Sequence, residues 1–191
     1  NVAGCEKGSL RSHFSPYNLP TLDDGPEGEY MADRLTDEAI KLIKENGDSP
    51  FFLYLPHYTV HTPIQAPQSY VEKYQNKARE MGLDKVNALE EDGFFPCEHR
   101  KEHRIVRRLI QSNPIYAGMV DNLDWNIGRL LKAVDDEGLT QDTVVIFTSD
   151  NGGLSTSEGS PTCNLPLSEG KGWMYEGGTR EPLIIKYPDV I

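Results

Sequence analysis

Three stretches of the chain repeat apolar residues every three or four positions, which is the spacing of an amphipathic α-helix. They cover about residues 31–46, 68–79 and 113–136. The third is the longest, and its apolar stripe comprises Tyr116, Met119, Val120, Leu123, Ile127, Leu130, Leu131 and Val134. We therefore predict three helices, and we expect Gly138 to end the last one, since glycine commonly follows a helix C-terminus.

Between and after these stretches lie three short runs of continuous apolar residues, at 51–55, 143–148 and 182–187. Runs of this length without polar alternation are typical of strands that are covered on both faces. Because helices and such strands alternate along the chain, we predict an α/β fold with a largely parallel sheet flanked by helices. Residues 1–30 show no period and are predicted to be mostly loop, and the charged segment 77–110 is predicted to be a solvated insertion.

The chain has 191 residues, about the size of one domain, and a formal net charge of -11. That acidic balance argues against a nucleic-acid binder that relies on phosphate contacts. No apolar run approaches the roughly 18 residues that a membrane span needs. Cys5, Cys97 and Cys163 form no C-x-x-C pair, which argues against a thiolate zinc site. The sequence opens without an initiator methionine or a signal peptide, so we expect it to be a portion of a longer protein.

Polar residues follow directly after two of the predicted strands, where sites form in open α/β sheets. The second of these strands runs into Asp150 and Asn151, which place a carboxylate beside an amide oxygen. Both are hard oxygen ligands of the kind that Ca²⁺ or Mg²⁺ binds, and Gly152 and Gly153 allow a tight turn after them. Two oxygens do not complete a Ca²⁺ shell, and a turn that ends a strand explains the same residues without a metal. Both interpretations remain open at this stage.

A histidine and a lysine add to this chemistry. His61 lies six residues beyond the first predicted strand, in a segment that Pro63 and Pro67 stiffen. Imidazole donates hydrogen bonds to anions and transfers protons near neutral pH, while an ordinary loop histidine is the alternative; for His57 we favour a supporting role. Lys171 has a glycine on each side, which leaves room for an oxyanion, and a solvated surface lysine is the alternative. Together, metal oxygens, a histidine and a lysine are typical of a site for an anionic ester.

Several motifs follow one another in a recognisable order. Pro-Phe-Phe-Leu-Tyr-Leu-Pro at 50–56 leads to His-Thr-Pro at 61–63, and Val-Ile-Phe-Thr-Ser-Asp-Asn-Gly occupies 145–152. Gly-Lys-Gly at 170–172 then leads to Tyr-Glu-Gly-Gly-Thr-Arg-Glu-Pro at 175–182. With these motifs the chain resembles the sulfatase family, within the alkaline-phosphatase-like superfamily, over most of its length.

The resemblance implies part of an alkaline-phosphatase-like sandwich and the hydrolysis of sulfuric esters. It implies that Asp150 and Asn151 are two of the oxygen ligands of the family's divalent cation, usually Ca²⁺. His61 then contacts the sulfate or the leaving-group oxygen, and Lys171 binds the sulfate and assists the leaving group. The implied partner is a sulfated small molecule or a sulfated glycan, and the implied location is extracytoplasmic: periplasmic, secreted or lysosomal.

The family's nucleophile is missing from this sequence. It stands first in the motif C/S-x-P-S-R and is oxidised to formylglycine, and none of the three cysteines begins such a motif. Asp23 and Asp24 lie in a Pro/Gly loop and so do not match the paired aspartates of the family's metal site. Lys101 and His103 spell the family's K-x-H, but after His61 instead of before it. We therefore expect residues 1–191 to be the later portion of a sulfatase catalytic domain, with the N-terminal segment, its formylglycine and the C-terminal subdomain outside this chain.

Two other functions remain open from the sequence. A metal-dependent phosphatase or phosphodiesterase of the same superfamily is the first, although Asn151 in place of a carboxylate or histidine ligand and the Gly-Lys-Gly run favour a sulfatase. A non-catalytic fragment is the second, and we expect the isolated chain to be inactive because it lacks a nucleophile. Loops such as residues 154–168 are where we expect substrate specificity to arise, but the sequence does not identify the substrate.

Overall fold

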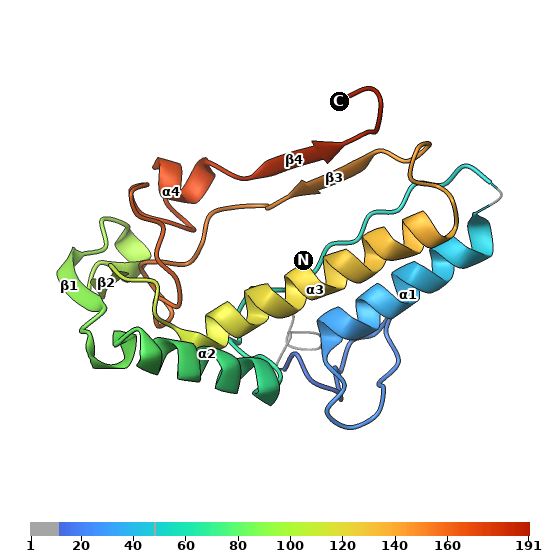
Figure 1. Ribbon diagram of the computed structural model, residues 1–191. Coiled ribbons are helices and arrows are strands. Elements are labelled where there is room, and N and C mark those ends of the chain that lie inside the picture. Colours follow the sequence, from blue (N-terminus) through green and yellow to red (C-terminus); the bar gives the residue numbers. More distant parts are fainter. Residues whose placement is uncertain (1–11, 48) are drawn as a thin grey trace. The chain divides into compact units, whose positions relative to one another are not determined.

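The computed structural model describes residues 12–47 and 49–191, so the predicted loop over residues 1–11 and Cys5 lie outside the described residues. The chain divides into two compact units, and Figure 1 traces their elements. Unit 1 comprises the chain up to Tyr74 together with Ile115–Thr143, and unit 2 comprises Gln75–Pro114 together with Val144–Ile191. None of the helices in the described part is long and apolar enough to cross a membrane.

The three predicted helices are confirmed. Helix α1 spans Met31–Asn46, α2 spans Gln68–Glu80 across the boundary between the units, and α3 spans Pro114–Asp136. Gly138 follows α3 with a φ of 70°, the left-handed conformation that glycine adopts at little cost. Residues 12–30 form loops with two isolated β-bridges, as their lack of period predicts.

The face that α3 buries differs from the predicted apolar stripe. Met119 is fully buried and packs with Ala66 and Val71, whereas Val120 is 46% exposed. Two asparagines, Asn122 and Asn126, are fully buried on the same helix. Both donate a hydrogen bond of 2.8 Å to Oδ1 of Asp33 on α1. The buried face includes these amides because one carboxylate satisfies both of them, a pairing that a hydrophobic pattern does not reveal.

Unit 2 contains two separate antiparallel pairs of strands. Strands β1 (Leu89–Phe94) and β2 (Arg104–Arg108) form a hairpin, and β3 (Val145–Thr148) pairs with β4 (Leu183–Lys186). The short helices are η1 (Leu83–Lys85), η2 (Glu98–Arg100) and α4 (Glu176–Thr179). Much of segment 77–110 thus belongs to a hairpin with Phe95 and Ile105 buried, and its assignment as an insertion stays a prediction.

The prediction of a largely parallel sheet is wrong for this chain. The described residues form helices and strands, but the strands occur only as two-stranded antiparallel sheets. Residues 51–55 form no strand, and Phe52 is 92% exposed. The runs at 145–148 and 183–186 are strands but are not buried, with Ile146 61% exposed. A continuous apolar run indicates a strand whose side chains favour burial. Which strands pair with it, and in which direction, depends on other segments of the chain.

Candidate active site

The first group of candidate residues lies where β3 ends. Asp150 and Asn151 come two and three residues after Thr148, the last residue of β3, with Asp150 exposed and Asn151 half-buried. Ser149 Oγ donates to the backbone carbonyl of Asn151 over 2.9 Å, which fixes the turn that follows the strand. The two predicted oxygen donors therefore leave the sheet together on an ordered turn.

The glycines beside these donors serve close packing of backbone against backbone. A Cβ on Gly152 would overlap the carbonyl group of Gly177, and one on Gly170 would overlap the carbonyl oxygen of Gly153. Neither Gly152 nor Gly153 has a positive φ, so a left-handed backbone conformation is not the reason for these residues. They are glycines because the facing loop approaches closer than any side chain permits.

Lys171 is held on the loop that faces this turn. Its backbone N–H donates to the carbonyl of Gly153 over 3.0 Å, and Gly152 N–H donates to the carbonyl of Gly178 over 3.2 Å. Lys171 itself is half-buried, and Gly172 after it has a φ of 88°. These bonds bring together the segment with the two oxygen donors and the segment with the lysine.

Asn164 is a residue of this site that the sequence did not single out. Its Nδ2 lies 2.7 Å from the carbonyl oxygen of Gly153, 2.9 Å from that of Glu169 and 3.2 Å from that of Gly177. One amide group thus contacts three carbonyls from the three segments that meet here. Asparagine is suited to this position because its NH₂ group offers two donors on a short side chain. In the sequence Asn164 is a single asparagine in a loop, and no motif around it indicates this role.

An ion pair connects the lysine loop to the hairpin. Arg107 on β2 lies 2.6 Å from Glu169 Oε1 and 2.7 Å from Asp92 Oδ2, and hydrogen bonds to both carboxylates raise the pKa of the arginine. The Glu169 side chain is 13% exposed, so this pair is largely shielded from water. Glu169 also has a positive φ of 61°, an uncommon conformation for a non-glycine residue. Arg107 therefore helps to hold the backbone two residues before Lys171.

His61 lies in unit 1, whereas the other three predicted site residues lie in unit 2. Its backbone N–H donates to the carbonyl of Tyr58 over 2.8 Å, and its Nδ1 lies 2.9 Å from the carbonyl oxygen of Thr62. The bond at Nδ1 leaves Nε2 as the ring nitrogen for any further hydrogen bond, and the residue is exposed. His13 packs beneath it, with Nε2 3.0 Å from the His61 carbonyl oxygen.

The donors at the end of β3 suit a hard cation in type. A nearby carboxylate, Glu181, has one buried oxygen with no hydrogen-bond partner among the described residues. Burial raises the pKa of Glu181, and the charge of Asp150 raises it further. A cation near these oxygens would relieve both effects. Nevertheless, the described part of the chain contains no group of three or more His, Cys, Asp or Glu that could hold a metal, and Asp150 with Asn151 forms only part of a shell.

A carboxylate, an amide oxygen and a lysine on adjoining loops are the kinds of groups with which hydrolases act on anionic esters. The sulfatase family model matches residues 4–191, so the chain belongs to the sulfatase family. It is 36% identical over 184 residues to a sulfatase from Formosa agariphila, and 29% identical over 192 residues to human arylsulfatase A. A solved structure of Ps i-CgsB in complex with k-i-k-neocarrahexaose matches 91% of this chain with a TM-score of 0.64 and 28% identity.

These relatives are much longer than this chain. The alignments cover 91% and 97% of the chain but 28% of the Formosa agariphila sulfatase and 29% of human arylsulfatase A. The same holds for Ps i-CgsB, of which 32% is covered. The chain therefore spans about three-tenths of the length of the proteins that it resembles.

Proposed function

We propose that this chain supplies cation-binding and sulfate-binding residues to a sulfuric-ester hydrolase. The observation that carries the proposal is the hydrogen bond from Lys171 N–H to the carbonyl of Gly153. It joins the backbone of a lysine to the segment that carries Asp150 and Asn151, in a chain of the sulfatase family. Loops held by such backbone bonds keep charged groups in fixed positions, as stabilisation of an anionic transition state requires.

Each residue has a distinct role in this proposal. The ammonium group of Lys171 pairs with a sulfate oxygen and stabilises charge on the leaving group. The exposed ring of His61, whose Nδ1–H is bonded to the carbonyl of Thr62, donates from Nε2 to the sulfate or to the leaving-group oxygen when it carries both ring protons. Asp150 and Asn151 would hold a divalent cation, most often Ca²⁺ in this family, which would supply further positive charge for the sulfate. The formylglycine nucleophile belongs to a segment outside this chain.

The proposed substrate is a sulfated glycan or a smaller sulfate ester. Support for a glycan comes from Ps i-CgsB, which was solved with k-i-k-neocarrahexaose and shares the fold of this chain at 28% identity. The acidic character of the chain, with a net charge of -11, does not favour any substrate, because the chain and a sulfate ester are both anionic. Binding of the ester then depends on local cations such as Lys171.

The test is sulfate release by the full-length protein that contains this chain, with formylglycine confirmed by mass spectrometry. Aryl sulfates, sulfated oligosaccharides and aryl phosphates are compared. We expect Lys171→Ala and His61→Ala each to lower kcat about 10²-fold or more on a sulfate ester, while the surface variant Lys85→Ala leaves it unchanged. Release of phosphate but not sulfate, or full activity in both site variants, would contradict the proposal.

The isolated chain provides a second test. Without a nucleophile we expect no turnover, and with only part of a metal shell we expect Ca²⁺ binding weaker than about 10⁻⁴ M. Calcium titration with a calorimetric readout measures this directly, and Asp150→Ala is the variant that should abolish what binding there is. Tight binding by the isolated chain would show that the described donors are more complete than we infer.

A further inference from the structure

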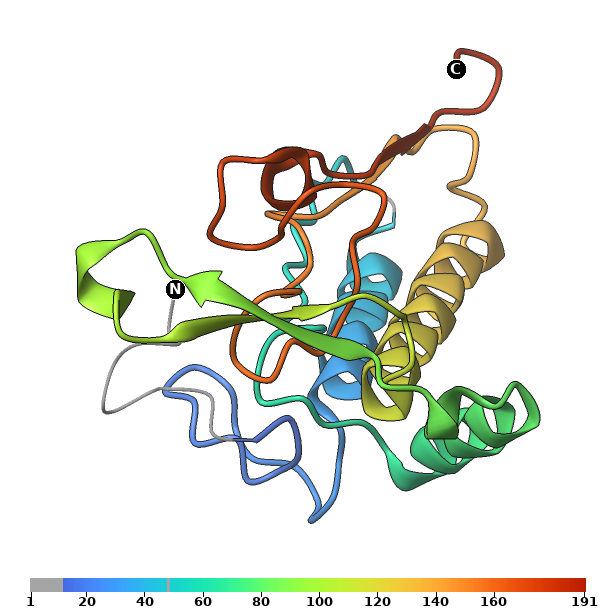
Figure 2. The ribbon, with the colours of Figure 1, turned by 90° about the vertical axis from the view of Figure 1, so that its left-hand side faces the viewer.

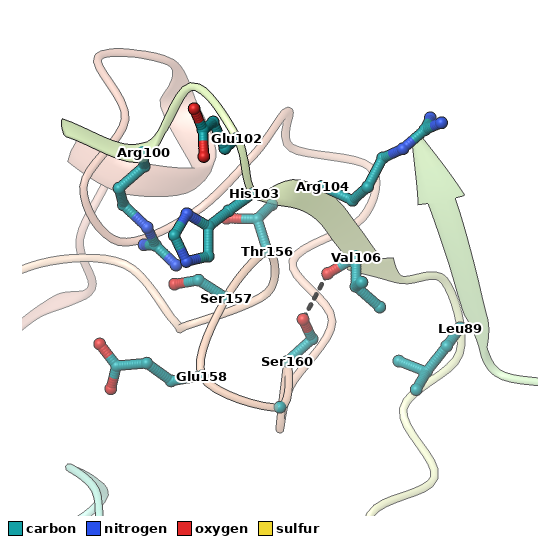
Figure 3. Close-up of a pocket in the computed structure, with 11 residues that line it drawn as sticks. Leu89, Arg100, Glu102, His103, Arg104, Val106, Thr156, Ser157, Glu158 and Ser160 are labelled. Carbon is teal, nitrogen blue, oxygen red and sulfur yellow. Dashed lines mark hydrogen bonds between the residues drawn. The ribbon is translucent and has the colours of Figure 1, made fainter. Parts of the chain in front are cut away.

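Unit 2 contains a cavity of about 410 Å³ that no part of the proposed active site uses. This volume lies within the roughly 300–1,000 Å³ typical of small-molecule sites. One wall is the segment between the hairpin strands and the other is the loop around residues 156–160 (Figure 3). The residues that line it are Leu89, Arg100, Glu102, His103, Arg104, Val106, Thr156, Ser157, Glu158, Gly159 and Ser160. The second wall belongs to the loop in which we expect substrate specificity to arise.

Arg100 is the distinctive charge in this cavity. Its guanidinium lies over the ring of Phe95, 4.2 Å from the ring centre, and no carboxylate of the described residues forms an ion pair with it. Its neighbours are occupied, because Lys101 pairs with Glu98 at 2.6 Å and Arg104 pairs with Glu91 at 3.3 Å. In a chain with an excess of acidic residues, an arginine without a carboxylate partner inside a cavity has its donors available to an anion.

The other groups of the cavity suit a sugar. In Figure 3 the side chains of Arg100 and His103 both point toward the loop that carries Ser157, whereas Arg104 points away from it. Ser160 Oγ donates to the carbonyl of Val106, which closes the base of the cavity. Two carboxylates, Glu102 and Glu158, line the cavity as well. Arg100 and His103 are the groups that suit an anionic substituent, whereas carboxylates and serine hydroxyls accept hydrogen bonds from sugar hydroxyl groups.

Aromatic rings connect this cavity to the lysine loop. Phe95, under Arg100, stacks on Trp173 with 5.8 Å between ring centres. Trp173 stands two residues after Lys171, and its Nε1 donates to Oγ1 of Thr156 over 2.9 Å. Thr156 itself lines the cavity. Figure 2 shows the loop that contains Thr156 passing beside the hairpin. The cavity and the candidate catalytic lysine thus share one ordered set of loops.

We propose that this cavity is a subsite for an anionic sugar unit of the substrate, adjacent to the unit that carries the scissile sulfate. Arg100 and His103 donate hydrogen bonds to the anionic group, and Ser157 bonds to a sugar hydroxyl. The proposal rests on the proposed function, since it names a second contact of the same substrate. A second sulfate and a uronic acid carboxylate offer the same charge to this site, and the experiment separates them.

The experiment uses the full-length protein and four substrates: an aryl sulfate too small to reach the cavity, and three matched oligosaccharides. The oligosaccharides carry, next to the scissile unit, a neutral sugar, a sulfated sugar or a uronic acid. We expect Arg100→Gln to raise KM about tenfold or more for the oligosaccharide with the preferred anion, because a charge-assisted hydrogen bond is lost. KM for the aryl sulfate and the neutral oligosaccharide stays unchanged, and so does kcat.

Two further variants make the result specific. Lys101→Gln removes the same charge from the adjacent residue, which does not line the cavity, and should have no effect. Ser157→Tyr fills the cavity without a change of charge and should raise KM for both anionic oligosaccharides. Arg100→Lys keeps the charge and should therefore raise KM less than Arg100→Gln does. Equal effects on all four substrates, or no effect of Arg100→Gln, would overturn the proposal.

The outcome separates this inference from the proposed function. If the wild-type protein releases no sulfate from any substrate, the proposed function fails. Calorimetric binding of the anionic oligosaccharides then still tests the cavity, with Arg100→Gln as the comparison. If sulfate is released but the anionic neighbour brings no gain in affinity over the neutral one, the hydrolase stands and the subsite is wrong.

Discussion

Replacing Asn164 by aspartate tests whether one amide holds the candidate active site together. The two side chains have the same shape, but the substitution exchanges the Nδ2 donors for a charged oxygen. That oxygen would face the carbonyls of Gly153 and Glu169, which now lie 2.7 and 2.9 Å from Nδ2. Two hydrogen bonds at about 1 kcal/mol each give a loss of about 2 kcal/mol, and repulsion between the oxygens adds to it. A shift of about 2 kcal/mol corresponds to roughly a 30-fold change in an equilibrium between ordered and displaced loops.

The assay measures kcat/KM of the full-length protein on an aryl sulfate, together with the rate of limited proteolysis between residues 150 and 178. We expect Asn164→Asp to lower kcat/KM at least about tenfold and to speed cleavage within this segment. Asn87→Asp makes the same change at an exposed position of unit 2 and serves as the control. If Asn164→Asp keeps wild-type kcat/KM and wild-type resistance to proteolysis, Asn164 does not position these loops.

Three further substitutions test other parts of the structure. Gly152→Ala should abolish activity and destabilise the protein by several kcal/mol, because its Cβ would overlap the backbone of Gly177; thermal unfolding and sulfate release measure both effects. Asp33→Ala should cost about 2–4 kcal/mol of unfolding free energy in a denaturant titration, because it removes the acceptor of two buried amides on α3. Burial lowers the pKa of His57 below 6.5, so the unfolded state binds more protons than the folded state as pH falls toward and below 6.5. The thermal midpoint should therefore drop on acidification from about pH 7.5 to about pH 5.5, and less so in His57→Gln; equal drops in both proteins would contradict this.

The helices were predictable because their amphipathic period is a local property of the sequence. The limits of α1, α2 and α3 agree with the predicted stretches to within a residue or two. The sheet was not predictable in the same way. The run at 51–55 and the strand β3 are apolar enough for a sheet interior, but strand pairing is a contact between distant segments. In the part of the chain that is described, β3 pairs only with β4, and antiparallel.

The sequence alone determined the family and supplied the candidate site residues, because motifs such as Asp150-Asn151-Gly152 and Gly170-Lys171-Gly172 are local and ordered. The tertiary structure decided how the loops that carry them are held. It gave Asn164 its three carbonyl neighbours. It also placed Arg100 in a cavity formed with residues more than 50 positions away in the sequence. The physical reason is that a hydrogen-bond partner or a cavity wall is supplied by whichever segment folds beside a residue, and no pattern within the residue's own segment records it.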